Sequence, residues 1–316
     1  TTMMAAKHKS DRLIDALPSL RGRIAEDAAL SKLTWFRVGG PAEILFRPAD
    51  VDDLAELLAR LSADIPVTVI GVGSNILVRD GGIPGVVVRL GDGFAGVTVD
   101  GDQIIAGTGA SNLKIAGEAR DAGLTGFEFL SGIPGSLGGS LRMNAGAFGA
   151  EMANIVNAVD AVGRAGPVQL GADDMGFSYR HSDVDENLIF VAAEMRGTPG
   201  DFGAIASRMA EIQEERGASQ PLKTPTGGST FINPEGHKAW ELIEEAGCRG
   251  LKRGGAMVSE KHCNFLINTG SATAADIEGL GEEVRRRVME ETGIRLEWEI
   301  RIIGIADDAS LAEVQT

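Results

Sequence analysis

The sequence is poor in cysteine and has no long apolar run. Its two cysteines among 316 residues, Cys248 and Cys263, lack the CxxC spacing of metal and redox sites, and a single disulfide would be a poor framework for this length. We therefore expect reduced, buried thiols and no metal site. No apolar run approaches the roughly 20 residues of a membrane span, and the first residues lack the apolar stretch of a signal peptide. These absences predict a cytoplasmic protein without a membrane partner.

Positive charge is also scarce. The chain has 30 lysines and arginines against 45 acidic residues, which gives a net charge of −15 at pH 7. A surface that binds nucleic acid needs basic residues in excess to neutralise phosphates, so nucleic acid is excluded as a general partner. Binding of a small anionic ligand is not excluded where basic residues gather locally. One such island holds a single acid, Glu260, among four basic residues: Arg249, Lys252, Arg253 and Lys261.

Glycine, by contrast, is abundant, with 43 residues in all and six within residues 132–149, "GIPGSLGGSLRMNAGAFG". In regular structure each glycine costs roughly 0.5–1 kcal/mol relative to alanine. The large apolar residues between these glycines argue against a flexible linker. Two readings stay open: tight turns, or backbone that lies close to an anionic or planar ligand. A second glycine turn at 71–75, "GVGSN", favours the ligand, because two such loops can offer amides to one extended cofactor.

The turn at 71–75 is not a dinucleotide-binding fingerprint. The third glycine of GxGxxG is missing, and strand-like rather than helical sequence follows. By itself the GxG pattern indicates only a turn.

The apolar periodicity predicts helices and strands in alternating groups and two domains, as the length allows. Asp50, Ser111 and the capping box of Thr273 with Asp276 predict helix starts. Further helices are expected at 202–216 and 239–246. Strands are expected at 42–49, 66–71, 86–90, 155–163, 187–197, 263–268 and 295–304, with a hairpin at 96–109. A change of pattern near Gly197 places a boundary close to residue 200.

Seven segments in order resemble one family. They are "TWFRVGG" (34–40), "GVGSNILV" (71–78), "GIPGSLGGSLRMNAGAFG" (132–149), "YRHS" (179–182), "GSTFINP" (228–234), "VSEKHCNFLIN" (258–268) and "EWEIRIIG" (297–304). Together they are similar to the UDP-N-acetylenolpyruvoylglucosamine reductases, flavoenzymes of peptidoglycan precursor synthesis, cell wall biogenesis, cell shape and cell division. The resemblance covers the chain from about residue 30 to residue 304.

The resemblance implies an α+β fold with a vanillyl-alcohol-oxidase-type FAD-binding domain of two subdomains and a smaller α+β substrate-binding domain. The expected division is an N-terminal segment 1–30, an FAD-binding domain 31–199 and a substrate-binding domain 200–316. Neither glycine loop contains histidine or cysteine, so the FAD is expected to be noncovalent. The implied cofactor-binding residues are Gly71, Gly73, Ser74, Asn75, Ile76, Leu77, Gly132, Ile133, Pro134, Gly135, Gly138, Gly139, Asn144, Gly146 and Ala147.

The implied reaction is the reduction of a UDP-sugar enol ether by NADPH through FAD. Hydride goes to the β-carbon, negative charge spreads into the carboxylate, and a proton goes to the α-carbon. The resemblance assigns Arg180 and Glu299 to the carboxylate and Ser229 to the proton. From the residues alone, the favoured readings are a surface arginine, a solvent-facing strand residue and a turn serine. The implied substrate-binding residues are Tyr179, Asn233, His262 and Lys261.

The family has a branch with an extra loop that carries a tyrosine over the substrate. Tyr179 is the single tyrosine here and belongs to the "YRHS" segment, so the chain resembles the shorter type II branch. We expect a monomer. Two alternatives stay open: another flavin oxidoreductase of the same superfamily, and a nucleotide-sugar-binding module without activity.

Overall fold

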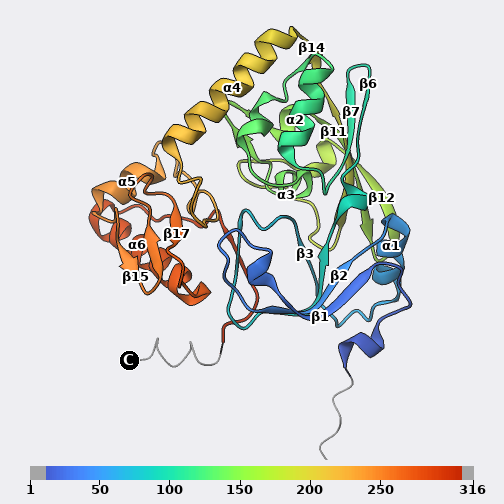
Figure 1. Ribbon diagram of the computed structural model, residues 1–316, viewed down its shortest axis with the longest axis horizontal. Helices are drawn as coiled ribbons and strands as arrows, with labels where there is room; N and C mark the ends of the chain where they lie inside the picture. Colours follow the sequence, from blue (N-terminus) through green and yellow to red (C-terminus); the bar gives the residue numbers. More distant parts are fainter. Residues whose placement is uncertain (1–11, 308–316) are drawn as a thin grey trace, which may run out of the picture.

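The computed structural model describes residues 12–307 and forms three packed units (Figure 1). The first unit is a four-stranded sheet in the order β1-β2-β5-β3, made of β1 (Arg23–Ala29), β2 (Pro41–Arg47), β3 (Val67–Ile70) and β5 (Ile83–Arg89). Strands β2, β5 and β3 run parallel, and β1 is antiparallel to β2. Helix α1 (Val51–Arg60) buries Leu54, Leu57 and Leu58. Its N-cap is Asp50, which accepts a hydrogen bond from Asp53 N, as predicted.

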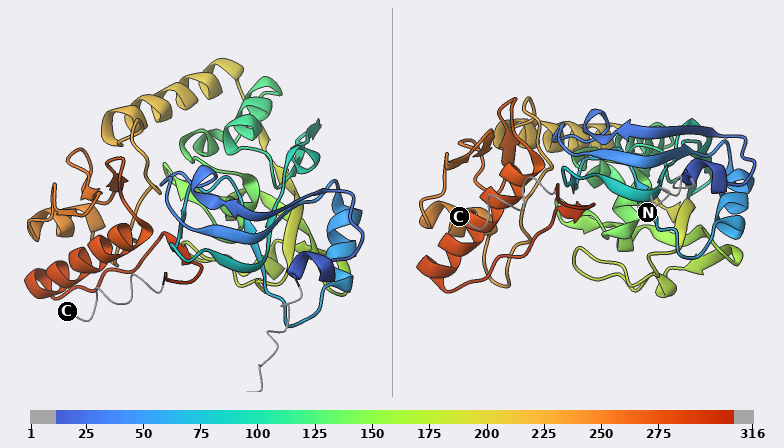
Figure 2. Two further views of the ribbon diagram at one scale, coloured as in Figure 1. Left: turned by 60° about the horizontal axis from the view of Figure 1, so that its bottom comes forward. Right: turned by 90° about the horizontal axis from the view of Figure 1, so that it is seen from below.

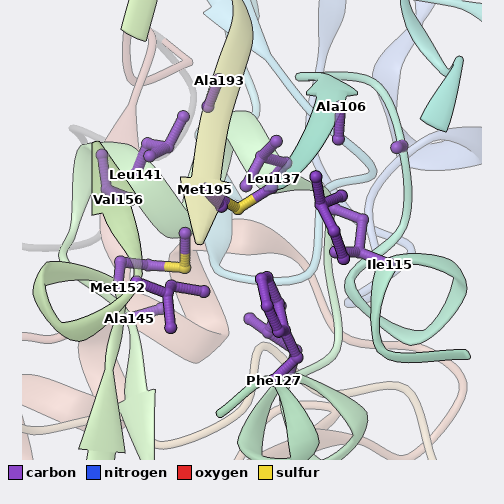
Figure 3. Packing of buried hydrophobic residues seen from close by; sticks show 14 of the residues in the cluster. Ala106, Ile115, Phe127, Leu137, Leu141, Ala145, Met152, Val156, Ala193 and Met195 are labelled. Atoms are coloured by element: carbon purple, nitrogen blue, oxygen red, sulfur yellow. The ribbon is translucent and has the colours of Figure 1, made fainter. Parts of the chain in front are cut away.

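The second unit is a five-stranded antiparallel sheet in the order β12-β11-β13-β7-β6. Its strands are β6 (Val97–Asp100), β7 (Gln103–Gly107), β11 (Val156–Gly163), β12 (Gly166–Gly171) and β13 (Ile189–Arg196). Helices α2 (Asn112–Asp121), α3 (Leu137–Arg142) and α4 (Phe202–Ser219) contribute to one core on this sheet, in which Phe127, Leu137, Met152 and Met195 meet (Figure 3). Val162, Ile189 and Val191 instead join Phe46 and Val88 in a core shared with the first unit.

The third unit lies to one side of the other two (Figure 2). It contains α5 (Ala239–Glu245), α6 (Ala274–Thr292) and a three-stranded sheet of β15 (Lys252–Arg253), β16 (Ala256–Val258) and β17 (Leu266–Asn268). The chain then returns to the first unit, where β18 (Arg301–Ile303) pairs in parallel with β4 (Ile76–Val78). Phe36, Val38 and Leu77 belong to the core of the third unit, so the glycine loop at 71–75 is fixed from both sides.

Short elements complete the described chain. They are the two-residue strands β8 (Leu124–Thr125), β9 (Gly146–Ala147), β10 (Ala150–Glu151) and β14 (Thr198–Pro199), and the 3₁₀ turns η1 (Leu13–Ala16), η2 (Leu30–Lys32), η3 (Asp92–Phe94), η4 (Glu128–Gly132), η5 (Met152–Asn154) and η6 (Asp173–Met175). Between residues 12 and 307, no helix has the length and apolar content needed to cross a membrane.

Most of the predicted elements are confirmed, including the 96–109 hairpin, the Ser111 cap and the capping box of Thr273 and Asp276. Strand β1 and helix α3 were not predicted. The predicted strand 295–304 is largely wrong, since only β18 is regular and Trp298 forms a single bridge to Phe231. Residues 1–11 of the expected N-terminal segment and residues 308–316 of the third segment lie outside the described residues.

Candidate active site

The loop between β3 and β4 presents a row of backbone amides without partners. The N–H groups of Val72, Gly73, Ser74 and Asn75 donate no hydrogen bond to any residue that the structure describes. Gly73 has φ +74°, and a Cβ on it would lie 2.5 Å from the carbonyl oxygen of Leu33. Successive free amides of this kind form a nest for an anion.

The second glycine segment lies directly against the first. Ser74 Oγ donates to the carbonyl oxygen of Pro134 (3.3 Å), and a Cβ on Gly71 would lie 2.8 Å from Ser136 Oγ. Gly135 has φ +133°, which L side chains rarely adopt. At the start of α3, a Cβ on Gly139 would meet nothing within 4 Å. The two loops therefore form one glycine-walled cradle with open space beside Gly139.

Not every predicted cofactor residue faces this cradle. Leu77 is fully buried in the core of the third unit. Asn144 is also fully buried, and its amide donates to Ser178 O (3.1 Å) and accepts from Ala153 N (2.9 Å). A Cβ on Gly132 would lie 2.4 Å from the Phe148 ring. These three residues pack or form hydrogen bonds on the interior side of the loops and so support the loop conformation.

Arg180 and Glu299, both assigned to the substrate carboxylate by the resemblance, form a shielded ion pair with each other. Arg180 Nε lies 3.1 Å from Glu299 Oε1, with side-chain exposures of 20% and 14%. Burial raises the pKa of Glu299, and the neighbouring Arg180 charge opposes that shift. Arg180 has φ +59°, a conformation that is costly for a residue with a side chain. Gly146 of the second loop is close enough that its Cβ would lie 3.3 Å from Arg180 Nη1.

Asn75 connects the first loop to the backbone of Glu299. Its Nδ2 donates to the carbonyl oxygen of Glu299 (3.1 Å), and its own carbonyl oxygen accepts from Arg301 N (3.1 Å). Glu299 N in turn donates to the carbonyl oxygen of Thr230 (2.8 Å). The amide nest and the ion pair are thus held by one short chain of hydrogen bonds.

Ser229 sits beside this chain of contacts. It precedes Thr230 and follows Gly228, whose added Cβ would lie 3.9 Å from the carbonyl oxygen of Ser74. Its half-buried hydroxyl makes no hydrogen bond within residues 12–307. Ser229 therefore follows a glycine that lies near the first loop, and its hydroxyl is uncommitted. Lys223, a basic side chain in the loop before Ser229, is exposed.

Sequence reasoning missed one residue that positions Ser229. The buried amide of Asn264 donates to Phe231 O (2.8 Å) and accepts from Phe231 N (2.9 Å), while its backbone oxygen accepts from Thr230 N (2.8 Å). The available signal was a polar side chain within the apolar stretch "CNFLIN", since a buried amide needs partners.

The predicted substrate-binding residues are only partly gathered. Tyr179 is exposed beside Arg180, whose guanidinium carbon lies 5.1 Å from the ring centroid. Asn233 Oδ1 accepts from Ala239 N (2.9 Å), and Lys261 Nζ donates to Gly217 O of α4 (2.7 Å).

His262 is half-buried, and burial lowers its pKa. No contact among the described residues joins Asn233, Lys261 or His262 to the Arg180–Glu299 pair. These three predicted substrate-binding residues therefore do not contact the ion pair.

Comparisons with known proteins identify relatives of the chain. A family model for the C-terminal domain of UDP-N-acetylenolpyruvoylglucosamine reductase matches residues 220–303, and one for an FAD binding domain matches residues 42–169. The UDP-N-acetylenolpyruvoylglucosamine reductase of Paramagnetospirillum magneticum is 61% identical over 308 residues, which are 97% of this chain and 100% of that protein. That of Azorhizobium caulinodans is 58% identical over 93% of this chain and 96% of its own.

Two solved structures are similar in fold. UDP-N-acetylenolpyruvylglucosamine reductase from Thermus caldophilus superposes with a TM-score of 0.77 at 35% identity, over 90% of this chain and 100% of that one. A 6-hydroxy-D-nicotine oxidase from Arthrobacter nicotinovorans gives a TM-score of 0.55 at 12% identity, over 94% and 92% of the two chains. At that identity the second likeness concerns the fold alone.

Proposed function

The chain belongs to the UDP-N-acetylenolpyruvoylglucosamine reductase family, and from that premise we propose which of its own residues perform each part of the reaction. The protein is an FAD-containing oxidoreductase that uses NADPH to reduce UDP-N-acetylglucosamine enolpyruvate to UDP-N-acetylmuramate in peptidoglycan biosynthesis. The expected α+β, vanillyl-alcohol-oxidase-type fold is confirmed. The alternatives of another flavin oxidoreductase and of an inactive binding module are set aside by the relatives.

The two glycine loops fit FAD. The free amides of Val72 to Asn75 suit a diphosphate, and the open face at Gly139 leaves room for a ligand against bare backbone. When bound, FAD supplies the hydride after taking one from NADPH. We assign the cofactor contacts of this chain to the backbone of both loops, and the side chains of Leu77 and Asn144 to their support.

Arg180 and Glu299 receive the carboxylate of the substrate. The planar guanidinium of Arg180 can bind a carboxylate through two parallel hydrogen bonds, which favours the negative charge that develops there. An ionised Glu299 would repel that charge. Burial raises the pKa of Glu299, which favours its neutral form, and a neutral carboxyl group can donate a hydrogen bond. The positive charge of Arg180 opposes this rise in pKa. A substrate carboxylate that pairs with Arg180 would neutralise that charge and so remove the opposition.

Ser229 supplies the proton to the α-carbon. The observation that carries this assignment is its uncommitted hydroxyl, next to Thr230, whose carbonyl oxygen accepts from Glu299 N (2.8 Å). A proton donor must be within hydrogen-bond reach of the atom it protonates, and the position of Gly228, whose added Cβ would lie 3.9 Å from the carbonyl oxygen of Ser74 in the first loop, supports a hydroxyl beside the flavin.

The test separates the two half-reactions in Ser229→Ala. The variant should bind FAD and be reduced by NADPH at a near-normal rate, then be reoxidised by substrate ~10²–10⁴-fold more slowly, the range for loss of a general acid. Ser229→Cys should recover part of the loss. Ser219→Ala, which removes an exposed hydroxyl at the end of α4, is the matched control. If Ser229→Ala turns over at more than about a tenth of the normal rate, the proton comes from elsewhere.

The division of the chain is also a proposal. We assign residues 31–199 to FAD and 200–316 to the substrate, in support of which the two family models match on either side of residue 200. Two elements cross this division: β1, within residues 1–30, pairs with β2, and the first turns of α4 pack Ile205 and Met209 on the core of the second unit.

Substrate contacts, location and assembly complete the proposal. Tyr179, Asn233, Lys261 and His262 are proposed to contact the UDP-sugar, for which Asn233 keeps its Nδ2 donors and Lys261 two further N–H donors beside their present backbone partners. A cytoplasmic monomer of the type II branch is proposed, and the two unpaired thiols support a reducing compartment.

A further inference from the structure

Three arginines lie side by side across the first sheet. Arg23 of β1 is the direct partner of Arg47 of β2. Phe46 of β2 is aligned with Val88 of the parallel strand β5, so Arg47 and Arg89 end neighbouring strands at the same level. Together with Arg21 they line a hollow of about 480 Å³. We call Arg23, Arg47 and Arg89 the arginine row.

The arginine row lacks counter-charges. Like charges directly opposite each other destabilise a sheet. Arg21 pairs with Asp50, but no carboxylate forms an ion pair with Arg23, Arg47 or Arg89 within residues 12–307. Asp92 also lines the hollow and is exposed without an ion pair. Burial, and then the charge of Arg47, lowers the pKa of the half-buried Arg89. An anion bound in the hollow would remove this repulsion.

The hollow continues the cofactor cradle. Its wall includes Val72, the first residue of the amide nest. The wall also includes Gly109, and the neighbouring Thr108 packs against Gly138 of the second loop. The row lies at the carboxyl ends of the parallel strands β2 and β5, the edge at which open α/β sheets bind ligands. Asn75, three residues further on, holds Glu299 at the opposite end of the nest. Arginine row, nest and ion pair thus follow one another in that order.

We propose that Arg47 and Arg89, with Arg23 at the rim, bind the phosphate-bearing adenylate half of FAD. The proposal rests on FAD as the cofactor. Its basis is the order of the three features: a cofactor with its redox ring near Arg180 and its flavin-side phosphate on the nest extends its adenylate half, with the second phosphate of the diphosphate, away from Glu299 and toward the hollow. The planar forks of arginine suit phosphate oxygens.

The experiment compares FAD with FMN, which shares the flavin but lacks the adenylate. Arg47→Gln, Arg89→Gln and the double variant are freed of flavin as full-length protein and titrated by flavin fluorescence. The dissociation constant for FAD should rise at least about tenfold in the double variant, whereas that for FMN should change less than about twofold. Arg208→Gln on the exposed face of α4, which removes an arginine paired with Glu211, should change neither.

Three results would overturn the proposal. An unchanged FAD affinity with a raised KM for NADPH would assign the arginine row to the phosphates of the nicotinamide nucleotide. An unchanged affinity for both would make the row a solvated surface. Loss of FAD together with a lower melting temperature of the flavin-free variants would give the arginines a structural role. Relief of the repulsion between them predicts instead that the flavin-free variants melt at the same temperature as the unaltered protein or at a higher one. The Ser229 experiment measures proton transfer in the holoenzyme, so either proposal can fail alone.

Discussion

At the scale of single residues, the site is defined by groups whose partners are few and shielded. Arg180 and Glu299 were predicted from a resemblance, and the structure brings them together although 119 positions separate them in sequence. The alternating pattern of "EWEI" does not distinguish a carboxylate of the site from a solvent-facing one. Such a pattern indicates which side chains share one face of a strand, but not which residue lies opposite them.

The Arg180 assignment predicts that lysine cannot replace arginine. Arg180→Lys keeps the charge and the same left-handed backbone cost at φ +59°, but loses the planar fork. Reoxidation of the flavin by substrate should slow by ~10²–10³-fold, almost as much as in Arg180→Ala. Reduction by NADPH, followed by stopped-flow absorbance, should stay fast in both variants. Equal losses in the two half-reactions would instead point to a disturbed fold.

The thiols give a second prediction at this scale. Burial is the main reason that the pKa of Cys263 is raised to about 12, and its Sγ also donates to Glu244 Oε2 (2.9 Å). Burial likewise raises the pKa of Cys248. Since the thiolate is the reactive form, neither cysteine should react with a chromogenic disulfide at pH 7–8 in the folded protein, and both should react after denaturation. Rapid labelling of the native protein would contradict this account.

The substrate-contact assignments show where residue-level prediction ends. Asn233 and Lys261 were singled out by the resemblance, but in the structure each binds a backbone group of a helix. Polar side chains satisfy whichever partner the fold brings near, and that partner lies in a distant segment. Their type and position could be predicted, but their partners could not.

At the scale of elements, local signals were the reliable ones. The caps at Asp50, Ser111 and Thr273 depend on neighbouring residues and are confirmed. Strand β1 is mostly exposed and has no apolar alternation, so the sequence carried no sign of it. Helix α3 contains two glycines in six residues and is stabilised by burial of Leu137 and Leu141, a tertiary effect that outweighs its low propensity.

The cradle predicts an unusual response at Gly139. Gly135 has a positive φ, and a Cβ on Gly138 would lie 3.2 Å from Thr108 Cβ, so substitutions there strain the fold whether or not a ligand is present. Gly139 is helical and faces open space. Gly139→Leu should leave the melting temperature of the flavin-free protein equal or higher, because glycine costs about 1 kcal/mol in a helix. The same variant should purify without flavin, since its side chain occupies the cradle.

A helical glycine elsewhere supplies the control. Gly217 of α4 also has nothing within 4 Å of an added Cβ. Gly217→Leu should keep its flavin, as measured by the ratio of flavin to protein absorbance. If Gly139→Leu retains a full complement of FAD, the open space beside α3 is not the cofactor site.

At the scale of the whole molecule, the two glycine loops belong to the first and second units, whereas Glu299 and Ser229 come from the segments of the third unit, and contacts between the units bring them together. Asn75 donates to the backbone of Glu299, and β4 pairs with β18 directly after that loop. These contacts span more than 220 residues of sequence, for example from Asn75 to Glu299. The sequence indicated two functional segments and their order, but not that one amide side chain couples them, because such register depends on the assembled fold.

The central claim is that one flavin, held by both glycine loops, serves NADPH and the enolpyruvyl nucleotide in turn. The most direct measurement is the flavin absorbance of the purified protein without oxygen. We expect a yellow protein whose band is bleached by NADPH and restored by a stoichiometric addition of UDP-N-acetylglucosamine enolpyruvate. A protein that is bleached by NADPH but does not recover its colour with this nucleotide would contradict the account.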